Sequence, residues 1–313
     1  MMDWRIAGGI LVGLVVVSVC LGVGLWLQSL QRKSRAERPP VRQKLLRPPG
    51  YGLLQRLDAL ADKFLERIIH MLVTGALLGL VLTVLYPVFA AMLDGKITLG
   101  QLVHARGGPQ VLSVMIAGLG VLFWALWAVL KAASAVADMR ACRLGLRGEQ
   151  AVAEMLSRES LRKAGYRAFH DVPGDGKWNI DHVVAGPSGV YVLETKTRSL
   201  RRATRDQPEN EVQFDGRTLR FPWCDDHEAA KQVERNARWV RKLMAGSVDS
   251  SIPVQPVIVV PGWFVRDRSR SDVRAMRGSF LLKRLLQAER NYTREQIQPL
   301  LSALEERCRT VEF

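Results

Sequence analysis

Residues 179–196 read NIDHVVAGPSGVYVLETK, and the prediction of the fold starts from their pattern of apolar, turn and charged residues. It contains two runs of β-branched or apolar residues, Val183–Val184 and Val190–Leu193, which are typical of strands. The Gly-Pro-Ser-Gly segment between them, residues 186–189, supplies turn residues. The stretch therefore predicts a β-hairpin.

Three charged side chains mark the open end of this hairpin. Asp181 begins the first strand and Glu194 ends the second, so antiparallel pairing would place the two carboxylates side by side. Because side chains alternate along a strand, Lys196 should share a face with Glu194 while Thr195 points away. The two carboxylates and the carbonyl oxygen of Thr195 are hard ligands of the kind that Mg²⁺ or Mn²⁺ takes. The alternative is structural: Asp181 would begin a strand, and Glu194 and Lys196 would form a surface ion pair of little energetic value.

Three long apolar runs precede the hairpin, at about residues 6–27, 68–93 and 111–130. Each is long enough to cross a hydrocarbon core of about 30 Å at about 1.5 Å per residue. They predict three membrane-spanning helices within a membrane region, residues 1–133. Two spans with a re-entrant or cleaved segment are the alternative, and a buried core helix could explain the second or third run.

Lysine and arginine residues are concentrated in the loop between the first two runs, residues 28–67, and are sparse in the loop between the second and third. The positive-inside rule predicts that residues 28–67 are cytoplasmic, that the amino terminus is outside, and that the carboxy-terminal domain is in the cytosol. In a bacterium the host bilayer would be the inner, cytoplasmic membrane. The basic loop could also attract anionic lipid or nucleic acid, or its charges could serve topology alone.

Residues 134–313 have the composition of a soluble domain with its own core. Lysine and arginine outnumber aspartate and glutamate in this domain, as they do in the whole chain, whose net charge is +15. A basic surface suits a polyanionic substrate. The four cysteines have no paired spacing, which agrees with a reducing compartment and gives no zinc pattern.

The order of the elements in this domain predicts the fold class. A helix near 148–164 and a strand near 166–172 precede the hairpin. A second, smaller hairpin at 212–221, a helix at 228–244, a strand at 254–260 and two carboxy-terminal helices follow it. Helices that alternate with a mixed sheet indicate an α/β sandwich.

Several of these motifs resemble a known family. The chain has Gly148-Glu149, then Asn179-Ile180-Asp181 and Glu194-Thr195-Lys196, and then a helix with Gln232 and Asn236. This order resembles the nuclease-related domain, NERD, of the PD-(D/E)XK, restriction-endonuclease-like superfamily. The resemblance covers a core of about residues 143–265 and implies a restriction-endonuclease-like α-β-β-β-α-β sandwich.

The resemblance also implies an activity and a role for each matched residue. It implies metal-dependent cleavage of DNA, with Asp181 and Glu194 as metal ligands. Lys196 would position or activate the water, and since two carboxylates should keep it protonated, we expect it to orient water or to counter phosphate charge. Glu149 would be the additional acid, a ligand directly or through water, although a charge near a helix amino terminus is its structural alternative. Gln232 would support Lys196 or the substrate.

Four arginines follow the motif and could contact the nucleic-acid backbone, with a solvated loop as the equal alternative: Arg198, Arg201, Arg202 and Arg205. Two functions from different classes remain open on the sequence, a membrane-anchored nuclease and a non-catalytic, membrane-anchored module that binds nucleic acid or a partner. Cleaving both strands with one site per chain would favour a homo-oligomer. Nothing in the sequence separates DNA from RNA.

Overall fold

The computed structural model describes residues 44–93, 108–176, 178–202, 208–245 and 251–312, together with residues 18, 19, 22 and 26. The chain divides into two compact units. The first comprises residues 1–38 and 58–139, and the second comprises residues 39–57 and 140–313.

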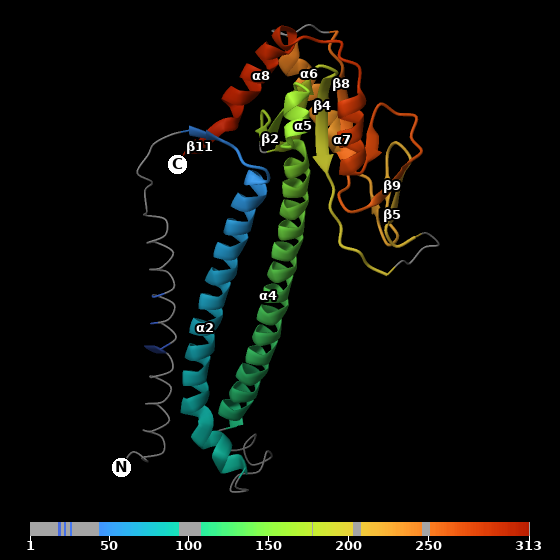
Figure 1. Ribbon diagram of the computed structural model, residues 1–313. Coiled ribbons are helices and arrows are strands. Elements are labelled where there is room, and N and C mark those ends of the chain that lie inside the picture. Colours follow the sequence, from blue (N-terminus) through green and yellow to red (C-terminus); the bar gives the residue numbers. More distant parts are fainter. Residues whose placement is uncertain are drawn as a thin grey trace. The chain divides into compact units, whose positions relative to one another are not determined.

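Two long helices dominate the amino-terminal half of the described chain (Figure 1). Helix α2 spans Tyr51–Leu93, and helix α4 spans Gly108–Leu156. The predicted runs at 68–93 and 111–130 lie within these helices, whereas most of the run at 6–27 lies outside the described residues. Both helices extend well beyond the apolar runs because no proline or glycine cluster separates the apolar residues from the Ala-, Leu- and Arg-rich residues beside them.

Among the described residues, one helix is long and apolar enough to cross a membrane, Leu122–Leu156 within α4. Its most apolar stretch has a mean hydropathy of 1.4, and only 11% of that stretch is buried within the protein. The structure therefore supports one candidate span and does not support the predicted three-helix membrane region.

The second unit is built on a mixed five-stranded sheet in the order β10-β8-β4-β3-β2. Strands β2, β3 and β4 are antiparallel neighbours, and β8 and β10 add parallel strands beyond β4. The strands are β2 (Arg167–Pro173), β3 (Asn179–Gly186), β4 (Gly189–Thr195), β8 (Val254–Val259) and β10 (Arg274–Met276). The predicted hairpin is confirmed as β3 and β4, and its turn uses Gly189 at φ +119°, a backbone conformation that glycine adopts without strain.

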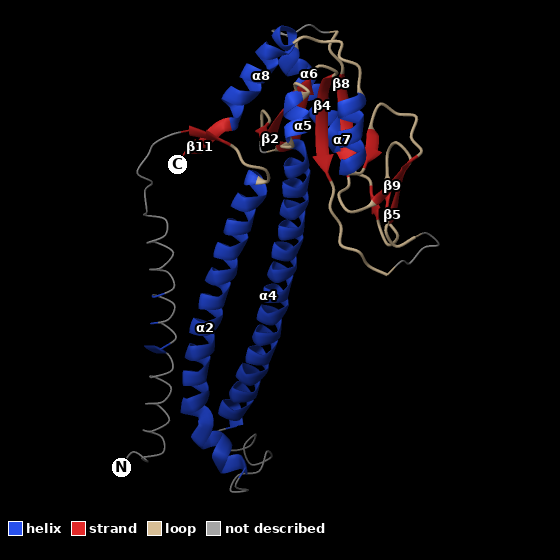
Figure 2. Cartoon of the chain, in the orientation of Figure 1, coloured by secondary structure: helices blue, strands red, loops and turns tan. Residues whose placement is uncertain are grey.

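Helices cover both faces of this sheet, with strands red and helices blue in Figure 2. One face packs against α6 (Ala229–Met244) and α8 (Arg294–Cys308). The other packs against the end of α4, α5 (Glu159–Lys163) and α7 (Gly278–Gln287). The β4 residues Val190 and Val192 face the first layer while Tyr191 and Leu193 face the second, so β4 is buried on both sides. The predicted α/β sandwich is thus a mixed α/β fold consistent with a nuclease-like architecture.

A second, four-stranded sheet has the order β7-β6-β5-β9. Its strands are β5 (Glu211–Phe214), β6 (Leu219–Arg220), β7 (Asp225–Asp226) and β9 (Phe264–Asp267). The predicted small hairpin is confirmed as β5 and β6, whose turn contains Gly216 at φ +102°. The sequence does not predict β9 or β10, because each is only three or four residues long.

The segment before α2 belongs to the second unit. Strand β1 (Lys44–Leu46) pairs antiparallel with β11 (Arg309–Glu312), and the Arg47 amide donates to the carbonyl of Cys308 (2.9 Å). The basic, proline-containing residues 32–50 are expected from their sequence to be extended and poorly ordered. That expectation is wrong for residues 44–50, because the strand that pairs with β1 lies more than 260 residues away and leaves no local signal.

Candidate active site

The register of the hairpin brings Asp181 next to the end of β4. His182 lies opposite Leu193, which sets Asp181 beside Glu194 at the open end of the pair. The amide of Thr195 donates to the carboxylate of Asp181 (N···Oδ2 2.6 Å). The strand pairing in the structure therefore places Asp181 and Glu194 side by side, as the sequence predicts.

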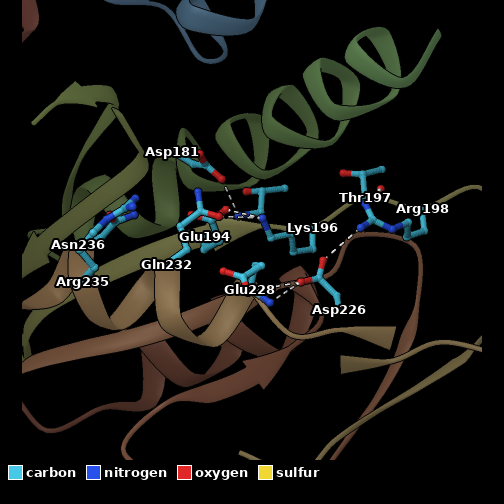
Figure 3. Close-up of polar contacts among 12 residues, drawn as sticks. Asp181, Glu194, Lys196, Thr197, Arg198, Asp226, Glu228, Gln232, Arg235 and Asn236 are labelled. Carbon is cyan, nitrogen blue, oxygen red and sulfur yellow. Dashed lines mark hydrogen bonds and ion pairs between the residues drawn. The ribbon is translucent and has the colours of Figure 1, made fainter. Parts of the chain in front are cut away.

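Lys196 connects β4 to helix α6 (Figure 3). Its ammonium group lies 2.8 Å from Oε1 of Glu194 and donates to Oε1 of Gln232 at 3.0 Å. The Glu194 side chain is only 2% exposed, and that of Lys196 is 18% exposed. Gln232 therefore occupies the lysine-supporting position that the resemblance implied.

Glu149 reaches the same region from the last turns of α4. It is buried, and the charges of Asp181, Asp171 and Glu194 act on it. The preceding residue, Gly148, allows α4 to approach the chain after β4 closely, because a β-carbon at this position would overlap the Thr197 side chain. The Gly-Glu pair thus has a physical explanation: the glycine allows the contact and the glutamate faces the acidic cluster.

Asp171 is a further acid of this region that the sequence does not predict. It lies within β2, between the paired residues His170 and Val172, with φ 48°, and is 4% exposed. Its carboxylate forms an ion pair with Arg47 (3.0 Å) and accepts hydrogen bonds from the amide of Gly52 (3.0 Å) and the side chain of Asn179. No local pattern marks Asp171, since its partners come from the segment before α2, from the first turn of α2 and from β3.

Burial and mutual repulsion make the acids of this cluster hold their protons. Burial, followed by the charge of Asp181, raises the pKa of Glu194 to about 8. Burial and the charges of Asp181, Asp171 and Glu194 raise the pKa of Glu149 to about 9, and burial raises that of Asp181 to about 6 although the Thr195 amide opposes the shift. Burial lowers the pKa of Lys196, but neighbouring carboxylates, Glu194 foremost, leave it above its ordinary value. The positive charge near these three acids is therefore too small to offset the effects that raise their pKa values.

One carboxylate oxygen of this cluster has no hydrogen-bond partner among the described residues. Oε2 of Glu194 is buried and accepts no hydrogen bond from them, a costly state for a carboxylate oxygen. Asp181, Glu194 and the carbonyl of Thr195 offer hard oxygen ligands, so the donor chemistry fits a divalent cation such as Mg²⁺ or Mn²⁺. Among the described residues, no group of three or more His, Cys, Asp or Glu side chains is arranged to hold a metal, so the carboxylate pair would depend on the carbonyl and on water to complete the coordination.

The four arginines after the motif do not form one group. Arg198 is bound to Asp226 (3.0 Å), whose carboxylate also accepts from the first amides of α6, and its guanidinium lies over the Phe221 ring. Arg201 and Arg202 are exposed, and Arg205 lies outside the described residues. Arg198 thus joins the chain after β4 to α6, while Arg201 and Arg202 remain available to a ligand.

A basic surface beside Gln232 was missed by the sequence analysis. A hollow of about 410 Å³ is lined by one face of α6, with residues Glu228, Lys231, Gln232, Arg235 and Arg238. Its basic residues recur at intervals of four and three, the spacing of one helical face, so the sequence did carry the signal. The core positions predicted for α6 lie on the opposite face of this helix.

Comparison with known proteins agrees with this geometry for part of the chain. The family model described as nuclease-related domain (NERD) matches residues 144–261, a range that contains Glu149, Asp181, Glu194, Lys196 and Gln232. Searches of the curated proteins and of the solved structures found no match. The match supports a nuclease-related function and, with it, interaction with nucleic acid in general. Residues 144–261 thus carry a nuclease-related domain that fits the PD-(D/E)XK superfamily.

Proposed function

We propose that this protein is a membrane-anchored, metal-dependent nuclease that hydrolyses DNA phosphodiester bonds at the cytoplasmic face of a bacterial inner membrane. The observation that carries the proposal is the convergence of Asp181, Glu194 and Lys196 from one hairpin, with Gln232 bonded to the lysine. The match to the nuclease-related domain over residues 144–261 supports the same chemistry.

Mg²⁺ or Mn²⁺ is the proposed cofactor. The unpaired Oε2 of Glu194 and the raised pKa values of Glu149, Asp181 and Glu194 indicate that Lys196 alone does not compensate the charge of these carboxylates. Asp181, Glu194 and the Thr195 carbonyl would bind the ion, with Glu149 as a direct or water-mediated ligand. A bound divalent ion would polarise the phosphate and lower the pKa of its water. Because these acids bind protons tightly, cation affinity should rise with pH.

The remaining residues of the site act on position and charge. Lys196 keeps its proton, so it is unsuited to act as a base in the free protein. An ammonium group has three N–H donors, of which Glu194 and Gln232 accept two. The third can be directed to a phosphate oxygen or to the attacking water, where it would stabilise the charge that develops in the transition state. Gln232 fixes the ammonium group in this orientation.

The nucleic acid would approach over α6. Lys231, Arg235 and Arg238 line the hollow that contains Gln232, and Arg201 and Arg202 are exposed on the chain that follows β4. Such side chains contact phosphates without reading the sequence. The charge of this surface favours DNA or RNA alike, and DNA is the substrate that the family resemblance implies. A homo-oligomer would supply the second site needed to cut both strands.

The membrane anchor rests on the exposed apolar residues of α4. Large side chains there are more than half exposed within the protein, a costly arrangement in water and a favourable one in lipid: Leu122, Phe123, Leu126, Trp127 and Leu130. The loop charges described above favour a cytosolic carboxy-terminal domain. Within this proposal, a lipid bilayer is a partner of α4, and spans at 6–27 and 68–93 complete the membrane region.

The test is cleavage by the purified full-length chain in detergent. DNA and RNA are incubated with the wild type and with Asp181→Ala, with Mg²⁺, with Mn²⁺ or with chelator. Metal-dependent cleavage by the wild type alone supports the proposal, and equal cleavage by both proteins contradicts it. If neither protein cleaves and both bind nucleic acid in a salt-sensitive manner, the non-catalytic binding module becomes the better description.

A further inference from the structure

The second unit has another hollowed surface, whose lining does not include Glu149, Asp181 or Glu194. It consists of two adjoining hollows of about 560 and 420 Å³, which share Phe264 and Arg277. The end of α4, the start of β9 and the start of α7 line it, and α7 and β9 are labelled in Figure 1. We call this surface the Phe264–Arg277 groove.

Two phenylalanines of the groove face solvent. Phe264 is 49% exposed and Phe280 is 52% exposed, although each could bury far more surface in the core. Their neighbour Trp263 is buried and donates from Nε1 to the carbonyl of Arg198 (3.1 Å), which fixes this wall of the groove. The groove therefore presents aromatic rings on a firmly held backbone.

The charge of the groove is positive. Arg158, Arg277 and Arg284 are exposed, and their guanidinium groups have no hydrogen-bond or ion-pair partner among the described residues. The acid that lines the groove, Asp267, is already bound by Arg274 and by the amides of Ser269 and Ala275. Unpaired guanidinium groups around exposed rings complement a polyanion that carries planar groups.

The groove adjoins the site across the chain that follows β4. Thr197 packs on Gly148, and Val152, one helical turn further along α4, lines the groove. Arg198, two residues after Lys196, is bonded to Trp263 of the opposite wall. A nucleic-acid strand that passes from the carboxylates over Thr197 and Arg198 would enter the Phe264–Arg277 groove.

We propose that the Phe264–Arg277 groove binds a single-stranded segment of the nucleic acid that is cut at the Asp181–Glu194 site, an inference that rests on the proposed function. Bases stack on Phe264 and Phe280, while Arg158, Arg277 and Arg284 contact phosphates. Single strands are the fitting occupant because a duplex hides the faces of its bases, whereas unpaired bases can lie on aromatic rings. The substrate of the enzyme would then be DNA with a single-stranded portion next to the scissile bond.

The test measures binding separately from cleavage. Full-length wild type and the double variant Phe264→Ala/Phe280→Ala are titrated in chelator against a fluorescent oligothymidine and against a duplex of equal length. We expect the double variant to lose roughly tenfold or more in affinity for the single strand and less than about twofold for the duplex. Arg277→Gln should lower the dependence of single-strand affinity on salt by about one phosphate contact. Leu286→Ala, on the same helix as Phe280 and outside the groove, is the matched control, and equal melting temperatures exclude misfolding.

The outcomes separate the two proposals. Unchanged single-strand affinity in the double variant overturns the proposal that the Phe264–Arg277 groove binds single strands, even if the wild type cleaves duplex DNA. Ring-dependent binding without any cleavage supports the groove and removes the catalytic proposal. If the double variant keeps its affinity for the single strand but loses affinity for vesicles with anionic lipid, the groove belongs to a lipid headgroup and the present assignment is wrong.

Discussion

Glu194 is the most constrained side chain of the candidate site. Its side chain is nearly inaccessible, and Asp181 lies beside it. One carboxylate oxygen contacts the Lys196 ammonium, and the other has no hydrogen-bond partner in the described part of the chain. Burying a carboxylate in this way costs folding free energy unless a cation is bound. The burial of Glu194 is therefore better explained by a functional role of its carboxylate than by a contribution to folding stability.

The protonation of Glu149 gives a prediction for pH. Its pKa is about 9 in the folded chain against an ordinary value of 4.5, so the folded state keeps a proton that the unfolded state releases. The stability from this proton is complete below pH 4.5 and is lost as pH rises through about 9. In chelator, we expect the melting temperature to fall between about pH 7 and 9, with a slope of at most about 1.4 kcal/mol per pH unit from this group.

The measurement is thermal unfolding of the full-length chain, followed by tryptophan fluorescence. Glu149→Gln should flatten the pH dependence, and Glu154→Gln, an exposed position on the same helix, should leave it as in the wild type. Equal slopes for wild type and Glu149→Gln would show that this carboxyl is not protonated in the folded chain. If Mg²⁺ binds the cluster, adding it should flatten the wild-type slope as well.

The sequence could predict those site residues that lie close together along the chain. Asp181, Glu194 and Lys196 belong to one hairpin, and the period of two in a strand is enough to place them. Asp171 could not be predicted, because its role depends on Arg47 and Gly52, which are about 120 residues away. Glu149 and Gln232 were reached only through the family resemblance, since each lies on a separate helix.

Helix α4 contains both an apolar run and two residues of the candidate site region. It continues without a break from Gly108 to Leu156, and its last turns carry Gly148 and Glu149. The sequence analysis began a new helix at Gly148, because a glycine is usually a poor interior residue of a helix. In the structure, the lack of a side chain at Gly148 allows the close contact with Thr197.

Gly148 gives a prediction at this scale. An alanine β-carbon would lie 2.8 Å from Cβ of Thr197 and would overlap its hydroxyl, so the chain next to Lys196 must shift. We expect Gly148→Ala to lower cleavage at least about tenfold, because small displacements of catalytic groups are costly. Overpacking should lower the free energy of unfolding by about 1–3 kcal/mol.

Gly120 on the same helix provides the control. An added β-carbon there meets no atom within 4 Å, so Gly120→Ala should leave cleavage unchanged and should stabilise the helix by about 0.5–1 kcal/mol. Cleavage rates and melting temperatures of the two variants are compared with wild type. If Gly148→Ala cleaves at the wild-type rate, the contact with Thr197 does not position Lys196.

At the scale of the whole molecule, the second unit is discontinuous in sequence. Residues 39–57 belong to it, although the α2 and α4 segments of the first unit separate them from residues 140–313. Pairing of β1 with β11 and the contacts of Arg47 hold this segment. A fragment that begins after the apolar runs would therefore lack part of its own fold, and only the full-length chain contains the complete second unit.

Arg47 gives the corresponding prediction. Its guanidinium binds Asp171, Asn179 and Thr310, and removing it leaves the buried Asp171 carboxylate without its counter-charge. We expect Arg47→Ala to lower the free energy of unfolding by about 3 kcal/mol. The double variant Arg47→Ala/Asp171→Asn should recover part of this loss, because asparagine is uncharged and tolerates the positive φ of residue 171.

Chemical denaturation of the three proteins checks this prediction, with Lys44→Ala as a control at an exposed position of β1 that should change stability by less than about 0.5 kcal/mol. A loss for Arg47→Ala no larger than that of Lys44→Ala would mean that the contacts of Arg47 with Asp171, Asn179 and Thr310 do not stabilise the unit.

The metal-dependent activity of the carboxylate pair is measured by cleavage of end-labelled DNA by the full-length wild type and by Glu194→Gln, in Mg²⁺ and in chelator. Glu194→Gln keeps the size of the side chain and removes one potential metal ligand. We expect cleavage by the wild type only with metal, and a loss of at least about a hundredfold in the variant at equal melting temperature. Equal cleavage by the two proteins, or cleavage that persists in chelator, would contradict this expectation.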